Sequence, residues 1–127
     1  MCLLKEKKPE KEYTEGFKLF FFLDGKYHSL LFNQEREYEA GKEYQSDRGF
    51  LAFIEEMQAK DYKGLIDYCR HSCLEMKNFS KAELVIRKVT VKEVLLQGWT
   101  PTELWISHSP SYYAENSLLF KTMIINE

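Results

Sequence analysis

The side chains in this chain that are best suited to metal binding or catalysis are its histidines and cysteines: His28, His71, His108, Cys2, Cys69 and Cys73. Cys69 and Cys73 are spaced so that, on a helix, they would present two thiols on one face. Two thiolates could begin a metal site, but such a site needs three or four converging ligands. His71 would point to the opposite side of that helix, and no other pair completes the set. We therefore predict that both cysteines are small buried core residues, with no metal site and no cofactor.

A second arrangement of interest is Ser107-His108-Ser109, where an imidazole lies between two hydroxyl groups. Together with a distant carboxylate, such groups could support nucleophilic catalysis. The sequence lacks the Gly-x-Ser-x-Gly motif of many hydrolases, and it also lacks the glycine-rich motifs that bind phosphate groups. A histidine in a Ser/Pro turn is ordinarily solvated, so we predict no catalytic residue in this segment.

Aromatic residues near turns and element ends are the main candidates for binding, because Tyr and Trp are enriched at interface hot spots. One interpretation is that these rings close the ends of a small core. The other is that Trp99, Tyr112 and Tyr113 form a binding rim for a partner protein or a flat ligand. The full set of candidate binding residues is Trp99, Tyr112, Tyr113, Tyr38 and Tyr44.

A β-hairpin is the clearest element that could position these groups. An apolar strand over residues 16–23 leads into Asp24-Gly25, and a second strand is expected over residues 26–32. Asp-Gly between two apolar runs is typical of a type I′ turn, since that turn needs positive φ at both central residues. Further along the chain, Gly41 and the run 46–49 each predict a tight turn.

A single amphipathic helix is expected over about residues 54–77, because one apolar stripe recurs at helical spacing. The stripe consists of Tyr62, Leu65, Ile66, Cys69 and Cys73. Gly64 lies inside this pattern and is unfavourable in a helix interior, so two shorter helices are an alternative.

β-Branched residues predict one long strand or two consecutive strands over residues 83–96, with Gly98-Trp99 ending the pattern. Residues 112–116 are expected to be a loop. The apolar run 118–125 predicts a final strand, and its hydrophobicity favours a central place in the sheet.

These elements predict an α+β fold in which one principal helix packs on a mainly antiparallel, curved sheet. The charge-rich residues 1–13 are expected to form a flexible leader. Residues 14–127 are then a single domain, which suits the length of 127 residues.

The motifs Tyr38-x-x-Gly41-Lys42-x-Tyr44 and Gly49-Phe50-x-x-Phe53 precede a helix and a valine-rich strand. In this order they resemble a group of small uncharacterised phage and bacterial domains, over roughly residues 17–125. The resemblance implies a helix followed by strands that end in a glycine turn. It carries no established activity.

Composition excludes several classes of protein. The 18 basic and 20 acidic residues nearly balance, whereas a dedicated nucleic-acid binder is usually strongly basic. No run of residues is long and apolar enough for a membrane span or a signal peptide. The odd number of cysteines fits reduced thiols. We therefore expect a cytoplasmic protein that has no membrane or nucleic-acid partner.

Two functions remain open. The first is a non-catalytic interaction protein that binds a protein partner or a small ligand, such as a phage-encoded inhibitor or sequestering factor. The second is a small nucleotide-processing enzyme, such as an ADP-ribosyltransferase-like domain, with His28, Tyr44, Arg48 and Glu103 as candidate groups. The sequence also allows a homodimer formed through an exposed sheet edge.

Overall fold

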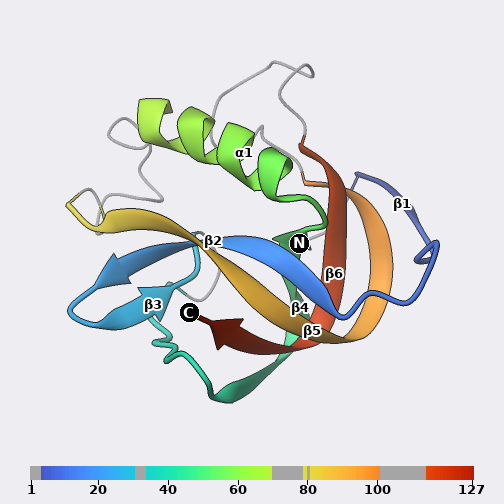
Figure 1. The fold of residues 1–127 in the computed structure, drawn as a ribbon, viewed down its shortest axis with the longest axis horizontal. Coiled ribbons are helices and arrows are strands. Elements are labelled where there is room, and N and C mark those ends of the chain that lie inside the picture. Colours follow the sequence, from blue (N-terminus) through green and yellow to red (C-terminus); the bar gives the residue numbers. More distant parts are fainter. Residues whose placement is uncertain (1–3, 31–33, 70–78, 80, 101–113) are drawn as a thin grey trace.

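The computed structural model describes residues 4–30, 34–69, 79, 81–100 and 114–127. They form six strands and one principal helix (Figure 1), in the order β1 (Leu4–Lys7), β2 (Glu15–Leu23), β3 (Lys26–His28), β4 (Glu43–Phe53), α1 (Glu56–Cys69), β5 (Glu83–Thr100) and β6 (Ala114–Asn126). The predicted α+β class is confirmed, with an antiparallel sheet and a single principal helix.

The sheet curves until it closes on itself. Its strand order is β1-β5-β6-β4-β2-β3, and β5 pairs with β2 as well as with β6 and β1. The strands β2, β5, β6 and β4 therefore form a closed circuit. The β2–β5 seam is long, from Glu15–Thr90 to Phe22–Glu83. The β2–β4 seam consists of the single register pair Phe17–Phe53.

The predicted hairpin is confirmed at its turn. Asp24 and Gly25 have φ values of 52° and 80°, as a type I′ turn requires. The second strand is shorter than expected, because β3 ends at His28. Tyr27 of β3 also pairs with Tyr38 in an isolated bridge that brings the segment before β4 back to the hairpin.

Part of the segment expected to be a flexible leader, Leu4–Lys7, forms strand β1 and pairs with β5. The reason lies in contacts distant in sequence. The backbone N–H of Glu10 donates to the Gln97 side chain at 3.0 Å, and the Tyr13 hydroxyl donates to the same oxygen at 3.3 Å. A charge-rich composition predicts a solvated segment. It does not predict that the buried side chain of Gln97 on β5 binds that segment.

The predicted turn at residues 46–49 is not a break between elements, because all four residues stay within β4. They form a bulge instead. Gln45 pairs with Thr122 and Phe50 with Phe120, so four residues of β4 face one residue of β6. Gly49 has φ of +89°, and a Cβ there would lie 2.6 Å from Leu119 Cδ1.

The region 83–96 forms one long strand, and the predicted end at Gly98-Trp99 is wrong because β5 continues to Thr100. The pairing of β5 with β6 continues past the glycine, with a shift in register between Gly98 and Thr100. Residues 114–116 also belong to β6 rather than to the expected loop. The central place predicted for the last strand is confirmed, since β6 lies between β5 and β4.

Helix α1 begins at Glu56 and runs through Gly64 to Cys69, so the glycine does not divide it within that span. Residues 70–77 of the expected helix, Cys73 included, lie outside the described residues. Tyr62 and Ile66 of the predicted stripe are buried, and Leu65 is half-buried. Within the described part of the chain, no helix has the length and apolar character needed to cross a membrane.

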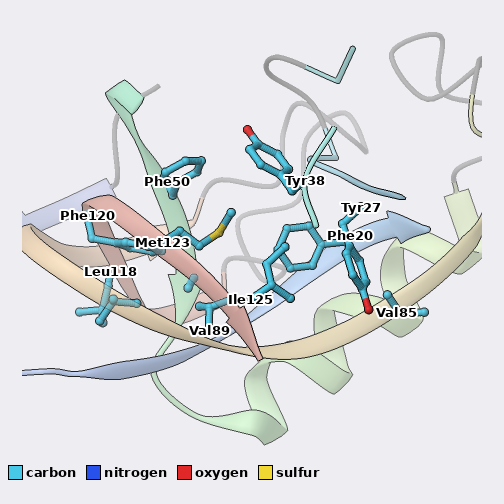
Figure 2. Packing of buried hydrophobic residues seen from close by; sticks show 12 residues of the cluster. Phe20, Tyr27, Tyr38, Phe50, Val85, Val89, Leu118, Phe120, Met123 and Ile125 are labelled. Carbon is cyan, nitrogen blue, oxygen red and sulfur yellow. The ribbon is translucent and has the colours of Figure 1, made fainter. Parts of the chain in front are cut away.

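One hydrophobic core lies inside the closed sheet. Figure 2 shows Phe20, Tyr38, Phe50, Met123 and Ile125 converging on this interior from different strands and from the segment before β4. Successive residues of β2 point to opposite sides, so Phe20 faces inward while its neighbours face outward. This alternation is what allows one strand to serve two cores.

The second core lies between α1 and the outer side of the sheet, which the helix crosses (Figure 1). Leu19 and Phe21 of β2 meet Ala59 and Ile66 of α1 here. Phe21 stacks on Phe79 with ring centres 5.1 Å apart. The helix therefore covers the face that the closed sheet would otherwise leave apolar and exposed.

Candidate functional site

Two of the candidate binding residues, Tyr38 and Tyr44, lie together. Their ring centres are 4.9 Å apart in an edge-to-face arrangement. Tyr38 is buried in the inner core, and burial raises the pKa of its hydroxyl. Tyr44 is half-buried, and its hydroxyl accepts a hydrogen bond from the Glu39 backbone N–H at 2.7 Å. For Tyr38 the core interpretation therefore applies rather than the exposed rim.

For the other three candidates, the structure describes at most the backbone. The backbone of Trp99 lies in β5, opposite Leu4 of β1. Tyr112 and Tyr113 lie outside the described residues. The proposed rim of Trp99, Tyr112 and Tyr113 therefore stays a prediction from the sequence.

His28 has a structural environment. It is buried, its Nδ1–H donates to the Gln34 carbonyl at 2.6 Å, and its ring centre lies 4.9 Å from that of Phe79. Among the residues that the structure describes, no group of three or more His, Cys, Asp or Glu side chains is placed to hold a metal ion. His71, His108, Cys2 and Cys73 lie outside those residues.

The bulge in β4 opens a polar hollow of about 340 Å³ on the surface. Its lining, called here the β4 hollow, comes from the bulge and from the segment before Tyr38: Glu35, Arg36, Gln45, Ser46, Asp47 and Arg48. β-Bulges redirect side chains and are over-represented next to active sites. Here the bulge lets the neighbours Asp47 and Arg48 line the same hollow, although successive residues of a regular strand point to opposite faces.

Arg36 is held firmly at this hollow. Its Nη1 donates to the Gln45 carbonyl at 2.8 Å. Its guanidinium carbon lies 5.2 Å from the ring centre of Tyr38 and 5.5 Å from that of Tyr44. A guanidinium fixed by two rings and a carbonyl loses little freedom when its remaining N–H groups bind a ligand.

Asp47 and Arg48 have no comparable restraint from the residues that the structure describes. Both side chains are exposed, and neither forms an ion pair with another described residue. Glu35 is exposed as well, so each sign of charge occurs twice in the β4 hollow. These groups are available to a ligand or a partner surface.

Other charged residues are used within the fold. Glu39 forms ion pairs with Lys26 and Lys42, and the hydrogen bond from Lys26 is the main cause that lowers its pKa to about 2. Lys18 donates to the Leu51 carbonyl at 2.8 Å, beside the β2–β4 seam, and desolvation lowers the pKa of its amine to about 8. Because these contacts join separate strands or loops, their role is structural.

Sequence reasoning missed the β4 hollow as a site, although it named Tyr44 and Arg48 in other contexts. The available signal was the run Ser46-Asp47-Arg48-Gly49, which marks a turn and carries both charges. No local pattern predicted that Arg36 also lies at the β4 hollow, because its position depends on the Tyr27–Tyr38 bridge.

Comparison with known proteins adds no relative. No protein-family model, no curated protein and no solved structure matches this chain.

Proposed function

We propose that this protein is a small non-catalytic binding protein that contacts a partner protein through the β4 hollow. The observation that carries the proposal is the contrast within this site. Arg36 is pre-positioned by Tyr38, Tyr44 and the Gln45 carbonyl, while Asp47 and Arg48 project freely beside it. Pre-positioned donors next to unpaired charges favour specific recognition of a complementary surface.

The resemblance to small phage and bacterial domains extends this proposal. In a phage setting, the partner is a host protein that this chain inhibits or sequesters in the cytoplasm. Neither the partner nor that setting is needed for the β4 hollow to bind, so the two parts of the proposal can be tested separately.

The geometry gives less support to a nucleotide-processing enzyme. Arg48 lines the β4 hollow, but His28 is buried against Phe79 and does not belong to its lining. Glu103 lies outside the described residues. The residues proposed for that chemistry are therefore not assembled into one described site.

A capture experiment with matched variants tests the proposal. The tagged full chain, the double variant Asp47→Ala/Arg48→Ala and the control variant Lys60→Ala are compared in the same lysate. Lys60 is exposed on α1, outside the β4 hollow. We expect one partner protein to be retained stoichiometrically by the parent and the control, and lost from the double variant. A partner that the double variant retains equally well would refute binding at this hollow.

A further inference from the structure

The balance of charge in the β4 hollow restricts what can bind there. Arg36 and Arg48 supply two cations, and Glu35 and Asp47 supply two anions. A ligand of one sign meets attraction from one pair and repulsion from the other. A ligand that carries both signs close together can satisfy both pairs.

These charges share one small part of the surface. Asp47 and Arg48 are adjacent in sequence, so their Cα atoms are about 3.8 Å apart. Both nevertheless line the hollow, because they lie on the bulge between Gln45 and Phe50. The matching charges on a ligand must therefore fit within this one hollow, as the side chains of nearby residues in one polypeptide segment can.

We propose that the β4 hollow recognises a polypeptide segment of the partner that presents an acidic and a basic side chain close together. This inference rests on the proposed function and specifies its partner. The acidic group meets Arg36 and Arg48, and the basic group meets Glu35 and Asp47. Ser46 and Gln45 add neutral hydrogen-bonding groups to the same lining.

A phosphate-bearing small molecule fits this hollow less well. A nucleoside monophosphate carries close to two negative charges at neutral pH, and Glu35 and Asp47 would oppose them. The charge balance therefore favours a segment of mixed charge over a nucleotide, which makes the nucleotide a useful competitor in the test.

The experiment is a titration of the ¹⁵N-labelled full chain, followed by NMR, with three blocked peptides of equal length. One peptide carries a glutamate and a lysine close together, one carries two glutamates, and one carries two lysines. We expect the mixed peptide to shift the resonances of residues 35–36 and 45–48, with an affinity at least about fivefold above the other two.

Charge-changing variants sharpen the test because they predict a switch in preference. Asp47→Lys leaves the hollow with an excess of positive charge and is expected to prefer the acidic peptide. Arg48→Glu leaves an excess of negative charge and is expected to prefer the basic peptide. The control variants Asp61→Lys and Lys81→Glu make equal charge changes at exposed positions outside the hollow, and we expect them to keep the parent preference.

Three results would overturn the inference: equal affinity for all three peptides, no switch in the variants, or displacement of the mixed peptide by a stoichiometric amount of nucleoside monophosphate. The spectra themselves report whether each variant is folded. If the peptides fail to discriminate while the captured partner is still lost from Asp47→Ala/Arg48→Ala, the charge-pair inference fails and the proposed function stands. If the double variant retains the partner, both the charge-pair inference and the proposed function fail.

Discussion

At the scale of single residues, Lys18 is the cation, among the described residues, whose ionisation depends most clearly on the fold. Its side chain is half-buried, its amine donates to the Leu51 carbonyl, and desolvation lowers its pKa from 10.5 to about 8. The unfolded chain therefore binds more protons than the folded chain between those two pH values. The free energy of unfolding must rise with pH across that interval.

We expect this rise to be on the order of 1–2 kcal/mol, since partial exposure of the side chain weakens the effect. The variant Lys18→Met should lose the corresponding slope, whereas Lys60→Met, at an exposed position on α1, should keep it. Urea denaturation at several pH values between 7.5 and 9.5 measures the slope. Identical slopes in the parent chain and Lys18→Met would show that the amine is solvated.

Glu39 gives the opposite dependence on pH. Its pKa is held near 2 by Lys26 and Lys42, below the usual 4.5, so its contribution to stability is present above the higher value. That contribution is lost as the pH falls towards 2. We expect Glu39→Gln to unfold at a lower urea concentration than the parent chain at pH 7, and the difference to vanish near pH 2. A difference that persists unchanged in acid would contradict this account.

At the scale of elements, the bulge in β4 depends on Gly49. Its φ of +89° disfavours any residue with a side chain, and a Cβ would lie too close to Leu119. We expect Gly49→Ala to destabilise the fold by about 1–3 kcal/mol, because backbone strain adds to the clash. Thermal unfolding followed by circular dichroism measures this loss. A neutral effect would mean that the bulge relaxes without cost.

Replacing Gly64 in α1 by alanine is expected to change the stability of the fold in the opposite direction. Beyond its chain neighbours and the local helix backbone, a Cβ at this position meets no atom of the described residues within 4 Å, and the residue lies inside a regular helix. We expect Gly64→Ala to stabilise the fold by about 0.5–1 kcal/mol, because alanine loses less backbone freedom than glycine on helix formation. The same thermal measurement applies. Destabilisation would indicate that another part of the protein needs the open space beside the helix.

At the scale of the whole molecule, the two cores share strands β2, β4 and β5 and should unfold together. Phe20 and Phe21 are neighbours on β2, yet the first lies in the inner core and the second in the core under α1. We expect Phe20→Ala and Ile66→Ala each to cost about 2–5 kcal/mol. In each variant, the helix and the aromatic side chains should lose their structure in one transition. Separate transitions for far-ultraviolet and near-ultraviolet signals would show that the cores are independent.

Local sequence determined the elements whose conformation depends on neighbouring residues. Asp24-Gly25 predicted the hairpin turn, because positive φ at two successive positions is a local property. The stripe containing Tyr62 and Ile66 predicted the described part of α1, and the apolar run 118–125 predicted the central strand β6. Each signal lies within a few residues along the chain.

The candidate site, in contrast, was decided by tertiary structure. The run 46–49 has the composition of a turn. Because the residues of β4 directly before and after it pair with β6, the run stays inside β4 as a bulge. Arg36 reaches the β4 hollow only because Tyr38 is anchored to Tyr27 on the hairpin. Charge and turn propensity are local quantities, whereas strand register is set by pairs far apart in the sequence. The sequence therefore supplied the charged residues of the β4 hollow, and the closed sheet brought them to one place.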